Sequence, residues 1–128
     1  MGFGYMGKIL RVDLTSGKIW TEEPDDKFYR TYVGGRNLIA YYLLKESPRD
    51  ADPLGPANPL IFATGVLTGL PIGYSGRNSV GALNPLTGGY GESEAGGFFS
   101  AELKFAGFDA VVIQGQAARP VYLAGSRS

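Results

Sequence analysis

The sequence contains neither cysteine nor histidine, and these two absences exclude most familiar catalytic centres. Without thiolates the chain forms no disulfide, anchors no iron–sulfur cluster and offers no cysteine nucleophile. Without imidazole it has no Ser-His-Asp triad and no zinc site of the usual kind. Any chemistry here therefore depends on Asp, Glu, Lys or Tyr side chains, or on a borrowed cofactor.

The chain also lacks an excess of charge and a long apolar run. Twelve Lys and Arg residues balance twelve Asp and Glu residues, so we expect no general affinity for nucleic acid or for an acidic membrane. The N-terminus has no basic stretch followed by an apolar one, and no window approaches the ~18 apolar residues of a membrane span. These features predict a cytoplasmic protein that binds neither nucleic acid nor membrane.

What the sequence does contain is enough apolar material for one folded domain. The chain has 128 residues, of which 44% are hydrophobic, and globular domains most often hold ~100–150 residues. A hairpin is expected over 9–14 and 19–22, because apolar and charged residues alternate on both sides of a turn that contains Gly17. Helices are expected over about 24–33, 37–46 and 97–106, and strands over 60–64, 79–83, 109–114 and 120–123. Strands grouped in pairs favour an α+β fold with mainly antiparallel sheets over a doubly wound one.

Two phosphate-binding motifs can be set aside. A Gly-x-Gly-x-x-Gly segment begins at Gly2, but the dinucleotide-binding version follows a strand and opens a helix, whereas this one precedes a strand. The Gly-x-x-x-x-Gly-Lys-Ser/Thr pattern of a P-loop is absent. Any anion site must therefore be built in another way.

One arginine stands apart from the other charges. Residues 65–115 hold 12 of the 20 glycines, and Arg77 is the only cation between Arg49 and Lys104. In such an apolar, glycine-rich region we expect the guanidinium to be partly buried and to need an anion. Its partner is either a structural carboxylate, from Glu92, Glu94 or Glu102, or a phosphate that the planar guanidinium binds through two hydrogen bonds.

The segment that follows carries two carboxylates and two glycines. Glu92 and Glu94 resemble an acid/base pair, but a loop just before a helix also favours acidic residues because of the helix dipole, and this second interpretation is preferred. Gly96 and Gly97 then open the expected helix, whose N-terminus without bulky side chains favours anions. The aromatic residues Trp20, Tyr41 and Tyr42 are expected in the core or an interface.

Four blocks of the sequence, in order over nearly the whole chain, resemble the N-terminal domain of the tungsten-containing aldehyde:ferredoxin oxidoreductase family. They are 7–17 (GKILRVDLTSG), 63–69 (ATGVLTG), 84–88 (NPLTG) and 96–110 (GGFFSAELKFAGFDA). Family members are several times longer. The resemblance therefore implies that residues 1–128 are the N-terminal part of a tungstopterin-binding first domain, incomplete relative to the family.

The resemblance also implies a fold and a set of cofactors. Two packed antiparallel sheets carry a tungsten, or molybdenum, bis-pyranopterin with a magnesium ion between the pterin phosphates. A [4Fe–4S] cluster, whose cysteines lie in the portion missing from this chain, passes electrons to ferredoxin. By the same resemblance, Arg77 contacts pterin phosphate, Glu94 binds magnesium through its main-chain carbonyl, and Gly96 contacts the pterin through its main chain. An amide is usual at the Glu94 position; a main-chain ligand tolerates the carboxylate, which itself favours magnesium.

These observations predict an N-terminal cofactor-binding segment or subunit of an oxidoreductase that converts an aldehyde to a carboxylic acid. The alternative is a non-catalytic split subunit, or an assembly or interaction module, of the same fold. In either case this chain alone is expected to be inactive, with no catalytic residue of its own. The remaining domains or another subunit must complete it, and its exposed apolar surface predicts self-association or a tight protein partner.

Overall fold

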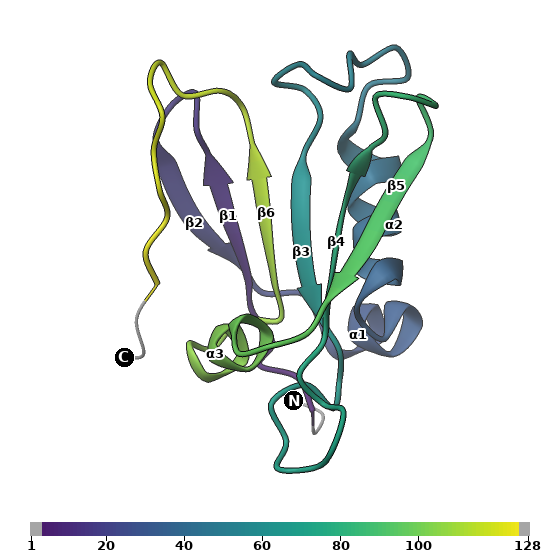
Figure 1. Ribbon diagram of the computed structural model, residues 1–128, viewed down its shortest axis with the longest axis vertical. Helices are drawn as coiled ribbons and strands as arrows, with labels where there is room; N and C mark the ends of the chain where they lie inside the picture. Colours follow the sequence, from purple (N-terminus) through teal and green to yellow (C-terminus); the bar gives the residue numbers. More distant parts are fainter. Residues whose placement is uncertain (1–3, 126–128) are drawn as a thin grey trace.

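The computed structural model describes residues 4–125, so Gly2 of the glycine motif lies outside the described residues. The expected hairpin, the three helices and the strands near 60–64, 79–83 and 109–114 are confirmed (Figure 1). In chain order the elements are β1 (Ile9–Asp13), β2 (Lys18–Glu22), α1 (Asp26–Tyr32), α2 (Arg36–Glu46), β3 (Leu60–Thr64), β4 (Asn78–Leu83), β5 (Tyr90–Ala95), α3 (Phe99–Phe105) and β6 (Ala110–Gln114).

The strands form one six-stranded sheet in the order β2-β1-β6-β3-β4-β5. All neighbours are antiparallel except β1 and β6, which run parallel although they come from opposite ends of the chain. The α+β class with mainly antiparallel pairing is therefore confirmed. Residues 4–125 contribute a single sheet, whereas the family resemblance implies two.

The core lies between one face of the sheet and helix α2. Ile61 and Ala63 of β3 point to this face together with Ile9, Ala110 and Val112, and all are buried. From the helix, buried Leu38, Ile39, Tyr42 and Leu43 pack against them, as the i, i+3/i+4 spacing of a helix requires. Helix α1 adds an aromatic cluster against α2. Tyr42 is thus a core residue, as expected.

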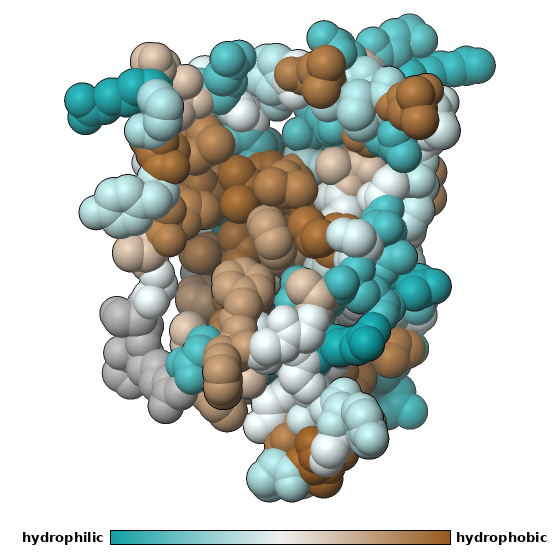
Figure 2. All heavy atoms as spheres, in the orientation of Figure 1, coloured by the Kyte–Doolittle hydropathy of each residue, from teal (hydrophilic) through white to brown (hydrophobic). Residues whose placement is uncertain are grey.

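The opposite face of the sheet carries apolar residues that no helix covers along most of its length. The alternating residues Leu10, Phe62 and Val80 point to this side, and Leu60 is 41% exposed there. Of the helices formed by residues 4–125, only α3 lies on it, at one end, where Phe99 packs against Phe62 with ring centroids 5.5 Å apart. Figure 2 shows apolar side chains gathered on this face over the strands. Apolar patches of this kind are typical of surfaces that a ligand or another surface covers.

A buried ion pair joins the two ends of the chain. Lys104 of α3 and Asp109, just before β6, lie 2.9 Å apart with 7% and 3% of their side chains exposed. The Asp109 carboxylate also accepts hydrogen bonds from the backbone N–H groups of Met6 and Gly7, and Lys104 donates to the carbonyl of Gly4. The N-terminal segment is therefore held against the corner between α3 and β6.

Two local predictions were wrong. No strand forms over 120–123: the segment pairs with neither edge strand, β2 or β5, and Pro120 has no backbone N–H for a ladder. Glu92 and Glu94 do not lie in a loop before a helix but in strand β5, where they pair with Gly81 and Ser79 of β4. Within residues 4–125, no helix is long and apolar enough to cross a membrane.

Candidate cofactor-binding site

Three glycine-rich segments, around Thr68, Gly76 and Gly97, meet at the end of the sheet where β4 begins. The hydroxyl of Ser100 donates to the carbonyl of Gly76 at 2.8 Å. A side chain on Gly76 would place its Cβ only 3.1 Å from the carbonyl oxygen of Gly97, so glycine is what permits the close approach. The hydroxyl of Thr68, itself buried, donates to the carbonyl of Arg77 at 3.2 Å. The backbone on both sides of Arg77 is thereby fixed.

The Arg77 side chain is more accessible than its sequence surroundings predict. We expected a partly buried guanidinium, but 71% of the side chain is exposed. The neighbouring apolar residues Leu70, Ile72 and Tyr74 are themselves exposed and do not cover it. Its Nη1 lies 3.2 Å from Oε2 of Glu94. Arg77 is therefore positioned by its backbone and leaves most of its guanidinium open to a ligand.

Glu94 contacts two arginines at once. Its Oε1 accepts a hydrogen bond from Nη2 of Arg36 at 2.9 Å, while its Oε2 contacts Arg77. The hydrogen bond from Arg36, followed by that from Arg77, lowers the pKa of the Glu94 carboxyl below its ordinary value. The carboxylate named beforehand as one possible partner of Arg77 is thus its partner in this structure.

Glu92 and Glu94 share the side of β5 that faces α2, but they are not arranged as an acid/base pair. Oε2 of Glu92 lies 3.7 Å from Nη2 of Arg36, and its other oxygen is buried without a hydrogen-bond partner. Glu92 thus gives the cluster a second negative charge. Two arginines and two glutamates make this cluster neutral overall.

Gly96 and Gly97 link this charge cluster to α3. No atom lies within 4 Å of a Cβ built on either residue, so both backbones border open space. The helix begins at Phe99 rather than at 97 and has seven residues, with no side-chain cap. The two glycines are therefore an accessible stretch of backbone beside Arg77 and Glu94, rather than the first turn of a helix.

The chain matches the family model described as "Aldehyde ferredoxin oxidoreductase, N-terminal domain" over residues 9–125. It belongs to this family. It is 50% identical over 121 residues to the "Tungsten-containing aldehyde ferredoxin oxidoreductase" of Pyrococcus abyssi and 48% identical to that of Pyrococcus horikoshii. Each alignment covers 94% of this chain and 20% of the relative. The chain therefore spans about a fifth of the length of these aldehyde ferredoxin oxidoreductases.

Two further comparisons widen the range of functions found with this domain. The chain is 38% identical to an "Aliphatic sulfonate oxidoreductase, WOR-like subunit" of Pyrococcus furiosus, of which it covers 20%. A solved structure titled "Active site complex BamBC of Benzoyl Coenzyme A reductase in complex with 1,5 Dienoyl-CoA" matches it with a TM-score of 0.88 and 36% identity. That match covers 92% of this chain and 18% of the other.

The residues of this aldehyde ferredoxin oxidoreductase domain fit a ligand that carries phosphate. Arg77 presents an exposed guanidinium, and Gly96 and Gly97 leave open space beside their backbone. Within 4–125, no three or more Asp, Glu, His or Cys side chains gather as a metal site would require. A magnesium ion held by phosphate oxygens and a main-chain carbonyl needs no such cluster.

Sequence reasoning missed Arg36 altogether. It lies 58 residues from Glu94 in the chain, and no local pattern connects the two. Only the pairing of β4 with β5 and the packing of α2 against β4 bring them together. Ser100 and Thr68 were missed for the same reason, since each acts through a backbone carbonyl in another segment.

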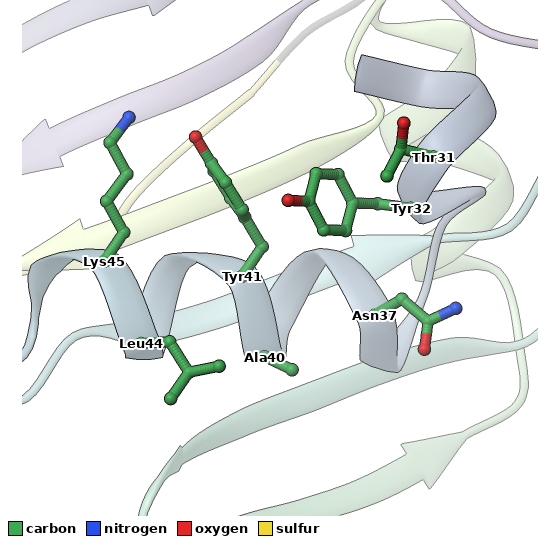
Figure 3. A pocket seen from close by; sticks show the side chains of 7 residues that line it. All are labelled: Thr31, Tyr32, Asn37, Ala40, Tyr41, Leu44 and Lys45. Carbon is green, nitrogen blue, oxygen red and sulfur yellow. The ribbon is translucent and has the colours of Figure 1, made fainter. Parts of the chain in front are cut away.

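A groove of about 510 Å³ lies apart from this cluster, on the outer side of α1 and α2. Figure 3 shows the rings of Tyr32 and Tyr41 next to each other, with Lys45 at one end and Leu44 on the helix beside them. The centroids of the two rings are 4.6 Å apart. The ammonium of Lys45 lies 5.3 Å from the centroid of the Tyr41 ring, an ordinary cation–π contact. None of Arg77, Glu94 and Gly96 lines this groove.

Proposed function

We propose that this chain is the tungsten bis-pyranopterin-binding N-terminal segment of an aldehyde:ferredoxin-type oxidoreductase, located in the cytoplasm. The whole enzyme would convert an aldehyde and water to a carboxylic acid, releasing two protons and passing two electrons to ferredoxin. The names of the relatives support the cofactor and the reaction class. When bound, the tungsten pterin, or its molybdenum counterpart, supplies the redox chemistry.

The observation that carries this proposal is the setting of Arg77. Its backbone is fixed by Thr68 and by the contact of Gly76 with Ser100, yet 71% of its side chain is exposed. An arginine whose backbone is fixed and whose side chain is exposed can bind an anion from outside the chain. A planar guanidinium suits the phosphate of a pterin cofactor because it forms two parallel hydrogen bonds.

Glu94 and Gly96 have complementary roles in this proposal. Strand β5 is the last strand of the sheet formed by residues 4–125, so alternate backbone groups point away from the sheet. The carbonyl of Glu94 would bind the magnesium ion between the pterin phosphates. The backbone of Gly96, beside which no side chain stands, would contact the pterin. Arg77, Glu94 and Gly96 thus form one edge of the cofactor site.

The rest of the enzyme must supply what this chain lacks. With no cysteine and no histidine, the chain has neither thiolates for a [4Fe–4S] cluster nor imidazole for proton transfer. We therefore expect the cluster in the portion that the relatives have beyond this segment. The uncovered sheet face that includes Leu60, Phe62 and Val80 would pack against the remaining domains or another subunit, and self-association would cover it in their absence.

A second candidate is a non-catalytic subunit or an assembly module of the same fold. It is favoured by the relative named as a "WOR-like subunit" and by the solved structure titled as an active site complex. In this case a separate chain would carry the catalytic residues, and this domain would contribute phosphate contacts alone.

Purification from the native source distinguishes these possibilities. Tungsten, molybdenum and pterin are measured on the purified protein, and each co-purifying chain is identified. Stoichiometric pterin in a longer polypeptide that contains this sequence supports the proposal, whereas pterin held together with a separate, tightly bound chain supports the second candidate. Absence of pterin from every fraction that contains this chain would contradict it. Aldehyde-dependent dye reduction by the 128-residue chain alone, at the rate of a whole enzyme, would contradict its dependence on other parts.

A further inference from the structure

The charge cluster at the start of α2 holds a second exposed arginine. Like Arg77, Arg36 is mostly exposed, with 61% of its side chain accessible. Its Nη2 contacts one oxygen of Glu94 at 2.9 Å, and Nη1 of Arg77 contacts the other oxygen at 3.2 Å. A single carboxylate therefore bridges two guanidinium groups from different elements of the fold.

The backbone of Arg36 is fixed as firmly as that of Arg77. The preceding residue, Gly35, donates its N–H to the carbonyl of Thr64 at 2.9 Å. A Cβ on Gly34 would lie 2.8 Å from the same carbonyl oxygen, so the chain reaches the end of β3 only because glycine is present. The hydroxyl of Tyr90 in β5 donates to the carbonyl of Arg36 at 3.2 Å. These contacts hold Arg36 where α2, β3 and β5 meet.

The Glu94 carboxylate bridges two arginines, and a phosphate group could bind between the same two guanidinium groups. Phosphate also presents two oxygens to two guanidinium groups, with more negative charge and additional acceptors. Glu92 lies on the other side of Arg36, 3.7 Å from its Nη2. It can keep the Arg36 side chain in place when Glu94 is displaced from it.

We propose that Arg36 is a second phosphate-binding residue of this site, and that Glu94 bridges Arg36 and Arg77 until a phosphate takes its place. This inference rests on the proposed function, because it assigns a further residue to the same cofactor site. The ligand class is a compound that carries a phosphate ester or a diphosphate.

The test is a calorimetric titration of the 128-residue chain with inorganic pyrophosphate, at low ionic strength and without magnesium. Arg36→Ala is expected to weaken binding about tenfold, the effect of losing one charge-assisted hydrogen bond. Arg77→Ala is expected to weaken it to a similar extent. Arg49→Ala is the matched control, because Arg49 is an exposed arginine beyond the opposite end of α2. This variant should bind pyrophosphate as tightly as the wild type.

Glu94→Gln gives the most distinctive result. Removing the negative charge frees both arginines from their shared partner, so pyrophosphate should bind several-fold more tightly than to the wild type. The gain should be smaller when Glu94→Gln is combined with Arg36→Ala, because only Arg77 is then freed, whereas a gain from lost charge repulsion alone would be the same with and without Arg36. Arg36→Lys keeps the charge but loses the planar fork, so it should bind between Arg36→Ala and the wild type. It also serves as the test if Arg36→Ala does not fold.

The outcomes separate the two levels of the proposal. Wild-type affinity in Arg36→Ala and Arg36→Lys, combined with weakened binding in Arg77→Ala, would overturn the role of Arg36 and leave the Arg77 phosphate site intact. If Glu94→Gln does not bind pyrophosphate more tightly than the wild type, the proposal that phosphate displaces Glu94 is wrong. If the wild type does not bind pyrophosphate, or if Arg77→Ala binds as well as the wild type, the phosphate site of the proposed function is wrong as well.

Discussion

Two clusters of charge in this domain have similar chemistry and opposite settings. Lys104 and Asp109 lie 2.9 Å apart with 7% and 3% of their side chains exposed, and backbone groups from residues 4–7 complete their hydrogen bonds. Arg77 and Glu94 lie 3.2 Å apart with 71% and 37% exposed. The first cluster is buried and holds the N-terminal segment against α3 and β6. The second cluster has a fixed backbone but exposed side chains.

This difference indicates what each cluster does. A buried pair whose donors and acceptors are all used within the chain has no capacity left for a ligand, and breaking it strands a charge. An exposed pair contributes little to stability, because water and salt compete with it. The exposed guanidinium of Arg77 is therefore not explained by a contribution to stability, and binding a ligand would explain it.

The largest loss of stability is expected from Asp109→Ala. The substitution leaves the ammonium of Lys104 buried without its partner and removes the acceptor of the Met6 and Gly7 N–H groups, which should cost about 3–5 kcal/mol of unfolding free energy. Urea denaturation measures this loss. Asp50→Ala, at an exposed position, is the control. A loss as small as that of the control would show that the pair does not close the fold.

An intermediate loss is expected from Arg11→Met. Arg11 is buried and binds Glu46 through two hydrogen bonds, of 2.7 and 2.6 Å, and Glu22 through a third. Glu46 and Glu22 are 23% and 35% exposed, so water can reach them once Arg11 is gone. We expect a loss of about 1.5–3 kcal/mol by the same denaturation assay, below that of Asp109→Ala. A loss equal to or greater than that of Asp109→Ala would mean that the exposure of the remaining partners does not determine how much stability is lost.

The smallest change in stability is expected from Glu94→Gln. It removes the ion pairs to both Arg36 and Arg77, but all three side chains are largely in contact with water. The melting temperature of the 128-residue chain should therefore stay close to that of the wild type at moderate salt. A large drop in melting temperature would show that this cluster stabilises the fold, as the Lys104–Asp109 pair does.

The sequence predicts the elements of this fold better than their long-range contacts. The hairpin around Gly17 and the helix before Pro48 follow from alternation, helical spacing and turn residues, which act locally. The strand that contains Glu92 and Glu94 was missed because two glutamates in a glycine-rich stretch are typical of a loop. Pairing with β4 makes it a strand, and no local signal reports that pairing.

The candidate site divides in the same way. Arg77 stands out in the sequence as an isolated cation, and the structure keeps it among glycines and hydroxyl groups. Its exposure was not predictable, since it depends on a loop whose apolar residues also face solvent. No sequence pattern points to Arg36, because its partner Glu94 is distant in the chain. Glu94 lies in β5, at the opposite end of the sheet from the β1–β2 hairpin that precedes Arg36.

If Arg77 binds a cofactor phosphate rather than stabilising the fold, the effects of a single substitution will show it. Arg77→Met is made both in the complete oxidoreductase that carries this domain, for its pterin content, and in the 128-residue chain, for its melting temperature. The account predicts a clear loss of pterin with a nearly unchanged melting temperature, and partial recovery of pterin in Arg77→Lys, which keeps the charge without the fork. Unchanged pterin content together with a large drop in melting temperature would contradict it.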